Sequence, residues 1–250
     1  MDEKYIVKSL VKAINVLECF SDLHPELGVS EISKMLRLQK STVFNILCTF
    51  EHCGYVTQDP KTSKYHLGLQ VLHLGYIVNH HMGLREILQP YLSRIADTTD
   101  EICYFGILDQ NEVLYIDSAY PNHVSQTRNI LGERAPLYCT GLGKAMLAFM
   151  PPSEQQAALS MGLKPFTNYT LTDCATLQKQ IEQIRAQGYA VDDMEHEFGI
   201  RCVAVPLFRA DGSVFAAVSV SGPSMRFDSD ILQRDAQIIQ DTIAPLQRCL

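Results

Sequence analysis

Apolar positions near the start of the chain recur with the spacing of three short amphipathic helices. The first stripe covers Ser9–Phe20, with Ser9 as the predicted N-cap, and the second covers Glu31–Leu36. A three-residue turn, Arg37–Gln39, leads to a third stripe that begins at Lys40. Two short helices joined by such a turn have the proportions of a helix-turn-helix.

A predicted β-hairpin follows the third helix. Tyr55–Gln58 and Tyr65–Leu67 have strand character, and the polar turn Asp59–Lys64 between them carries two lysines. Three helices and a hairpin are typical of a winged helix-turn-helix, in which the third helix enters the major groove and the wing contacts phosphates. A small helical protein-interaction domain with a solvated hairpin is the alternative. The predicted DNA-binding residues are Lys40, Ser41, Thr42, Asn45, Lys61 and Lys64.

The rest of the chain alternates between strand and helix patterns. Helices that flank a mostly antiparallel sheet define an α+β domain. We expect a DNA-binding domain at residues 1–68, a linker helix at 69–83 and a sensor domain at 84–250. Within the sensor domain the pattern predicts strands at 102–108, 112–119, 123–130, 200–208 and 213–221, and helices at 84–98, 141–149, 176–187 and 229–246.

The distribution of charge supports two parts with different roles. The first 81 residues hold eight basic and eight acidic residues, so the remainder carries the whole formal net charge of −7. A composition of 46% hydrophobic and 20% charged residues is typical of a globular protein. Charges interrupt the apolar positions at the N-terminus and no apolar run reaches about 18 residues, so we expect a cytoplasmic protein without a signal peptide or membrane helix.

The cysteines and histidines predict neither disulfides nor a metal site. Eight scattered cysteines form no C-x-x-C pair, which indicates reduced and mostly buried thiols. The adjacent His80 and His81 have no cysteine or carboxylate at zinc-ligand spacing. We therefore expect no metal and no cofactor.

Candidate ligand chemistry gathers in the second domain. Gly141 and Gly143 open a predicted helix, where backbone N–H groups can approach an anion, although close helix packing is an equal alternative and the P-loop pattern is absent. Ser219 and Ser221 are two residues apart on a strand, so both hydroxyls point to one face. Asp192 lies in a predicted acid-rich loop. These groups predict a site for a small carboxylate, with Asp192 accepting a hydrogen bond from a ligand hydroxyl.

Five runs of sequence carry a family resemblance along nearly the whole chain, namely VSEISKMLRLQKSTVFNILCTFEHCGYV, KYHLGLQVLHLG, GERAPLYCTGLGKAMLAF, GYAVDDMEHEFGIRCVAVPLF and VSVSGPSMRF. In this order they resemble the IclR family of bacterial transcriptional regulators. Asn45 and His66 stand where arginine is common in that family. The resemblance implies a GAF-like second domain whose effector pocket is lined by Gly141, Leu142, Asp192, Cys202, Ser219 and Ser221, with apolar lining from Val124, Ala135 and Ile200.

Two other classes of function are weaker interpretations. An enzyme would pair a nucleophile such as Cys139 or Cys202 with His196 and Asp192, but no local signature such as G-x-S-x-G is present. A dimeric interaction module without DNA binding is disfavoured by the wing lysines. We expect a transcriptional regulator without enzymatic activity that binds a double-stranded DNA operator as a homodimer or homotetramer and responds to a small organic-acid or sugar-acid effector. The family resemblance implies a repressor, with an activator of the same architecture as the alternative.

Overall fold

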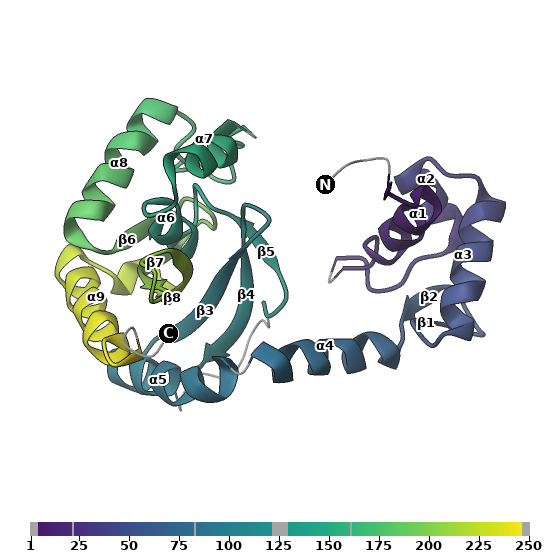
Figure 1. Ribbon diagram of the computed structural model, residues 1–250, viewed down its shortest axis with the longest axis horizontal. Helices are drawn as coiled ribbons and strands as arrows, with labels where there is room; N and C mark the ends of the chain where they lie inside the picture. The colour runs from purple at the N-terminus through teal and green to yellow at the C-terminus, as the bar shows by residue number, and fades with distance from the viewer. Residues whose placement is uncertain (1–4, 22, 83, 122–129, 161, 247–250) are drawn as a thin grey trace. The chain divides into compact units, whose positions relative to one another are not determined.

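The chain divides into two compact units, Met1–Gly83 and Leu84–Leu250 (Figure 1). The computed structural model describes residues 5–21, 23–82, 84–121, 130–160 and 162–246. Of the expected ligand-site residues, Val124 lies outside these ranges, as does most of the strand expected at 123–130.

The first unit contains the expected winged helix-turn-helix. Its buried core includes Val16, Ile32, Val43, Leu47 and Tyr65, because the apolar stripes of the first three helices face each other and the hairpin. The elements are α1 (Lys8–Leu17), α2 (Val29–Leu36), α3 (Lys40–His52), β1 (Val56–Gln58), β2 (Tyr65–Leu67) and α4 (Leu69–Met82). The two strands pair antiparallel and form the wing.

Local interactions fix the turn and the wing of this unit. Arg37 ends α2 in the left-handed conformation (φ 54°), and the Ser33 hydroxyl donates to the Leu38 carbonyl at 2.6 Å. In the wing, the Asp59 carboxylate accepts from the backbone N–H groups of Lys61 and Thr62 at 2.7 and 2.9 Å. The carboxylate therefore holds the lysine-bearing turn in one conformation.

Helix α1 begins and ends at residues other than the predicted ones, and α2 begins at Val29 rather than Glu31. Ser9 lies inside α1, and the N-cap is Val7, which makes no side-chain cap hydrogen bond. The helix ends at Leu17, so Cys19 and Phe20 follow it and are buried in the core. The predicted Ser9 cap was wrong because the Val7 carbonyl already accepts from the N–H groups of Leu10 and Val11, which begins the helix before Ser9.

The second unit is an antiparallel sheet covered by helices, which confirms the α+β expectation and agrees with a GAF-like fold. The strand order is β5-β4-β3-β8-β7-β6, and neighbours run antiparallel. The strands are β3 (Ile102–Asp109), β4 (Glu112–Ala119), β5 (Arg134–Pro136), β6 (Ala190–Asp193), β7 (Ile200–Phe208) and β8 (Val214–Pro223). The helices are α5 (Leu84–Thr99), α6 (Gly141–Leu147), α7 (Pro152–Ser160), α8 (Cys174–Gln187) and α9 (Ser229–Ile243), and a short 3₁₀ turn, η2, covers Ser224–Arg226.

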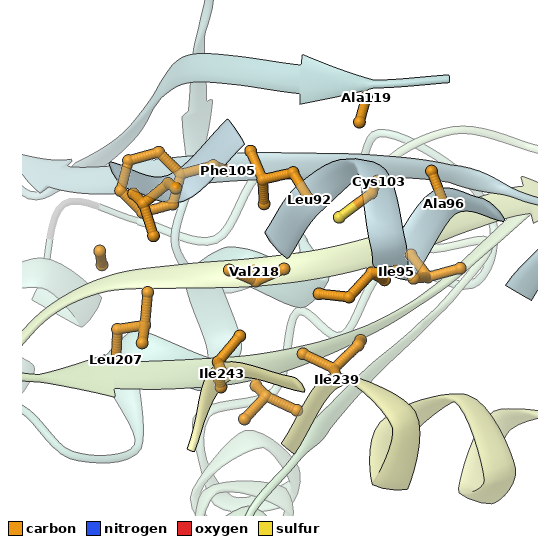
Figure 2. Packing of buried hydrophobic residues seen from close by; sticks show 14 of the residues in the cluster. Leu92, Ile95, Ala96, Cys103, Phe105, Ala119, Leu207, Val218, Ile239 and Ile243 are labelled. Atoms are coloured by element: carbon orange, nitrogen blue, oxygen red, sulfur yellow. The ribbon is translucent and has the colours of Figure 1, made fainter. Parts of the chain in front are cut away.

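Two hydrophobic cores lie on opposite faces of this sheet. On one face, α5 and α9 pack against alternate residues of β3, β7 and β8, as Figure 2 shows for Ile95, Ile239 and Val218. On the other face, Leu142 of α6 and Ile181 of α8 join the second core. Alternation along each strand thus supplies both cores, because successive side chains point to opposite faces.

Two strands and one α-helix of the second unit, β5, β6 and α7, were missed from the sequence. Asp192 lies on β6 opposite Cys202 of β7, and the expected acid-rich loop was wrong at this position. The strand escaped prediction because it has four residues, two of them aspartates, which are disfavoured in strands. Helix α7 was missed because its sequence has almost no apolar periodicity. The expected final helix ends at Ile243 rather than Leu246.

Close packing explains both glycines at the beginning of α6. A Cβ atom on Gly141 would collide with the Cys202 sulfur on β7. A Cβ atom on Gly143 would lie 2.5 Å from both the Cα atom and the carbonyl oxygen of Leu137. The helix can therefore contact the sheet and the preceding segment only because these two positions carry no side chain.

The first prediction concerns Gly143. Gly143→Ala is expected to lower the free energy of unfolding by about 1–3 kcal/mol, because backbone atoms must move to accommodate the methyl group. The control is Gly75→Ala in α4, where no atom lies within 4 Å of the new carbon. That change is expected to stabilise its helix by about 0.5–1 kcal/mol. Urea unfolding curves measure both, and equal effects would contradict the role given to close packing.

Candidate functional site

The second unit encloses a cavity of about 430 Å³ on the face of the sheet that α6 covers. Polar and apolar side chains from β3, β4, β6, β7 and β8 meet there. A volume of this size suits a small organic molecule. The cavity is lined by every described residue of the predicted ligand site, namely Ala135, Gly141, Leu142, Asp192, Ile200, Cys202, Ser219 and Ser221.

Strand register explains why these residues meet. Asp192 lies opposite Cys202, and Cys202 lies opposite Ser221, so three neighbouring strands place them in one row. The next row on the same face contains Ser219, with Tyr104 of β3 directly opposite. Ser219 is 1% exposed and Asp192 is 7% exposed, so the polar lining is withdrawn from bulk water.

The structure adds cavity residues that were not predicted to line a ligand site. The rings of Tyr104 and Tyr115 meet edge to face with centroids 5.8 Å apart, and both line the cavity. Glu101 and Arg226 also line it and form an ion pair at 2.6 Å. His196, which follows β6, is a further lining residue. The same-face position of Tyr104 and Ser219 depends on strand pairing, so spacing along the sequence could not reveal it.

A buried ion pair lies beside the cavity. The Lys144 ammonium on α6 is fully buried and contacts the Glu195 carboxylate, which follows β6. Lys144 also donates to the side-chain oxygen of Gln180 on α8 at 3.0 Å. The Thr170 hydroxyl donates to the Glu195 carbonyl at 2.6 Å and the Thr167 hydroxyl to the Met194 carbonyl at 2.7 Å. Lys144 thus holds the segment after β6 against α6, and the two threonines hold it against the segment between α7 and α8.

The environment of Asp192 makes its carboxyl group titrate near neutral pH. One oxygen accepts from the Glu195 backbone N–H at 2.8 Å. Burial raises the pKa of Asp192 to about 7, and the attraction of Lys144 only partly opposes this rise. Asp192 can therefore act as an acceptor when ionised and as both donor and acceptor when protonated.

The thiols near the cavity do not have the chemistry of nucleophiles. Burial raises the pKa of Cys139 and of Cys202 to about 12, so both remain protonated at neutral pH. Four of the seven described cysteines are buried, as expected, whereas Cys53 and Cys174 are exposed.

In the described parts of the chain no group of three or more histidine, cysteine or acidic side chains could hold a metal ion. Among the described helices, none is long and apolar enough to cross a membrane.

The predicted DNA-contacting residues occupy two parts of the first unit. Lys40, Ser41 and Asn45 are exposed at the beginning of α3, and Thr42 is half-buried beside them. Thr42 and Asn45 line a shallow groove together with Lys12 of α1, which the sequence did not indicate. In the wing, Lys61 is exposed, whereas Lys64 lies 3.1 Å from the Glu31 carboxylate of α2.

Comparison with protein families gives matches to both units. The family described as "IclR helix-turn-helix domain" matches residues 9–60. The family described as "Bacterial transcriptional regulator IclR C-terminal" matches residues 76–247. The two matches follow the same order as the two units of the structure.

Individual relatives match over almost the full length. The HTH-type transcriptional regulator XynR of Escherichia coli (strain K12) is 32% identical over 246 residues, covering 98% of this chain and 98% of that protein. The HTH-type transcriptional repressor AllR of the same strain is 32% identical over 244 residues, covering 97% and 90%. The crystal structure of an IclR transcriptional regulator from Alicyclobacillus acidocaldarius has a TM-score of 0.87 at 26% identity, covering 98% of this chain and 99% of that one.

The second prediction concerns the buried ion pair. Lys144→Met is expected to lower the free energy of unfolding by about 3–5 kcal/mol, because Glu195 loses its buried cation. Adding Glu195→Gln should recover part of this loss. Arg134→Met is the control, since its pair with Asp109 has both side chains 38% exposed and should contribute about 1 kcal/mol or less. Urea unfolding tests the order, and equal losses in Lys144→Met and Arg134→Met would contradict it.

Proposed function

Because the chain belongs to the IclR family of bacterial transcriptional regulators, we propose that its first unit binds operator DNA and that a small carboxylate in the cavity of the second unit controls this binding. The observation that carries the proposal is the coexistence of a winged helix-turn-helix and a polar cavity in one chain. A regulator working on bacterial DNA acts in the cytoplasm.

The first unit supplies the parts needed for DNA recognition. Ser41, Thr42 and Asn45 at the beginning of α3 reach base edges, while Lys40 and Lys61 neutralise phosphates. Repression released by the effector is our primary proposal, and the curated relative AllR is named a repressor. Activation by the same architecture is the alternative, since the residues do not determine the sign.

The cavity suits a small organic or sugar acid. The hydroxyls of Ser219 and Ser221, with the N–H groups at Gly141 and Leu142, are the proposed donors to a ligand carboxylate. Asp192 and Cys202 are the further polar contacts, and Ala135, Ile200, Leu142 and Val124 are the proposed apolar lining. Protonated thiols at Cys139 and Cys202 favour this regulatory role over an enzymatic one.

Exposed apolar surface supports assembly of more than one chain. On α1, Leu10 is 61% and Ile14 is 52% exposed, and on α4, Leu72 is 71% and Val78 is 57% exposed. Exposed apolar surface of this kind marks interaction sites in soluble proteins. A dimer also places two recognition helices on paired half-sites, which gives tighter and more specific DNA binding than one helix can.

The third prediction concerns DNA affinity. Replacing Lys40, Lys61 and Lys64 by alanine is expected to weaken binding to all sequences and to reduce the slope of log affinity against log salt by about one for each phosphate that is no longer neutralised. Lys61→Ala should change the slope more than Lys64→Ala, because Lys64 already pairs with Glu31. Replacing Ser41, Thr42 or Asn45 should instead alter sequence preference.

Fluorescence anisotropy with labelled duplexes at several salt concentrations measures these effects. Lys179→Ala is the control, because this lysine is exposed on α8 in the other unit. An unchanged affinity in the triple variant would refute the assigned DNA surface.

The fourth prediction concerns the effector site. Asp192→Ala is expected to weaken effector binding by about 1–3 kcal/mol, because a buried ligand group loses its partner, whereas Ser219→Ala should cost about 0.5–1.5 kcal/mol. A thermal-shift screen of carboxylates on the full chain identifies the ligand, and calorimetry measures the variants. DNA affinity without ligand should stay near that of the wild type. Wild-type ligand affinity in Asp192→Ala and in a Ser219→Ala, Ser221→Ala double variant would place the site elsewhere.

The fifth prediction concerns assembly. Light scattering at micromolar concentration should give a mass of two or four chains. Replacing Leu10 and Ile14 of α1, or Leu72 and Val78 of α4, by lysine is expected to lower this mass, because like charges would face each other across a symmetric interface. A strictly monomeric wild-type protein would contradict the proposal.

A further inference from the structure

Among the described residues, several of the charged side chains in and beside the cavity form ion pairs, but the carboxyl group of Asp192 does not. Lys144 contacts Glu195, Arg226 contacts Glu101, and Arg134 contacts Asp109. Asp192 also lines the cavity, and it forms no ion pair with any described residue. A second negative charge beside an ionised Asp192, in surroundings with little water, would be repelled.

The groups that face Asp192 do not remove this repulsion. From α6, Lys144 attracts the carboxylate, but its ammonium is already bound to Glu195 and Gln180. Glu195 adds negative charge, and its second carboxylate oxygen has no partner among the described residues. The further titratable groups near Asp192 are Cys139 before α6, Cys202 on β7, Tyr115 on β4 and, in the next residues of its own segment, Asp193, His196 and Glu197.

We propose that an anionic effector binds this cavity together with one proton, and that Asp192 carries that proton and donates a hydrogen bond to the ligand. The inference rests on the carboxylate site proposed above and specifies the protonation state in which it binds. The ligand is an anion, and it binds when Asp192 is neutral. The proton comes from solvent, and no other group changes charge. Two carboxylates that share a buried site generally hold one proton between them.

The hydrogen-bond geometry suits this role. Asp192 accepts from the Glu195 N–H at 2.8 Å, and the backbone N–H of His196 also donates to this carboxyl group, so the proton occupies a lone pair that neither donor uses. A neutral carboxyl group can then donate through its O–H and still accept through its carbonyl. Burial, which raises the pKa of Asp192 to about 7, makes this protonation accessible at physiological pH without a large cost.

The test compares ligand affinity at pH 6 and pH 8. Benzoate, pyruvate and gluconate serve as probes, with calorimetry on the full chain. For the wild type we expect about tenfold tighter binding at pH 6, because the protonated fraction of Asp192 changes by about that factor between the two values. In Asp192→Asn, which keeps a polar group of the same shape but cannot titrate, the affinity for the same probe should be nearly independent of pH.

His196 also lines the cavity and provides the second control, because a protonated imidazole would likewise favour an anion at low pH. His196→Gln should retain the tenfold dependence. If the dependence disappears in His196→Gln and persists in Asp192→Asn, the proton belongs to His196 and the inference is wrong. If the wild type binds a probe equally well at both pH values, the coupling to a proton is wrong but the carboxylate site stands. If no probe binds at either pH, the carboxylate site itself is wrong.

Discussion

The buried ion pair between Lys144 and Glu195 is the interaction on which the cavity depends. It joins α6, which covers the sheet, to the segment after β6, which carries His196 into the cavity lining. In a medium of low polarity neither charge can be left alone, so the two walls are fixed relative to one another. The beginning of α6 can approach the sheet because Gly141 leaves room for the Cys202 sulfur. Packing and electrostatics thus set the cavity shape together.

The two units differ in how their charges are distributed, and each faces a different anion. The wing and the beginning of α3 present lysines in a unit whose basic and acidic residues balance, so DNA attraction is local. The second unit carries the net negative charge, yet Arg134 and Arg226, which line its cavity, and Lys144 beside it each pair with a carboxylate. In the site that we propose, recognition of an anion therefore relies on hydrogen-bond donors and on the protonation state of Asp192.

Much of the fold could be predicted because its signals are local. The stripes of α2 and α3, the wing turn and the alternation of Ser219 and Ser221 with buried valines follow from spacing alone. The short strand β6, the Tyr104–Ser219 neighbourhood and the Lys144–Glu195 pair depend on contacts between distant segments, which periodicity does not encode. Gly141 and Gly143 were recognised as special positions, but only the structure shows the atoms that exclude a side chain.

Thermodynamic coupling between the two sites provides the most direct test of control by an effector. With the effector identified by screening, anisotropy measures the affinity of the full chain for its operator with and without effector, and calorimetry measures effector affinity with and without operator DNA. We predict that each ligand changes the affinity for the other by the same factor, of order tenfold or more. An effector that occupies the cavity and leaves operator affinity unchanged would contradict this control.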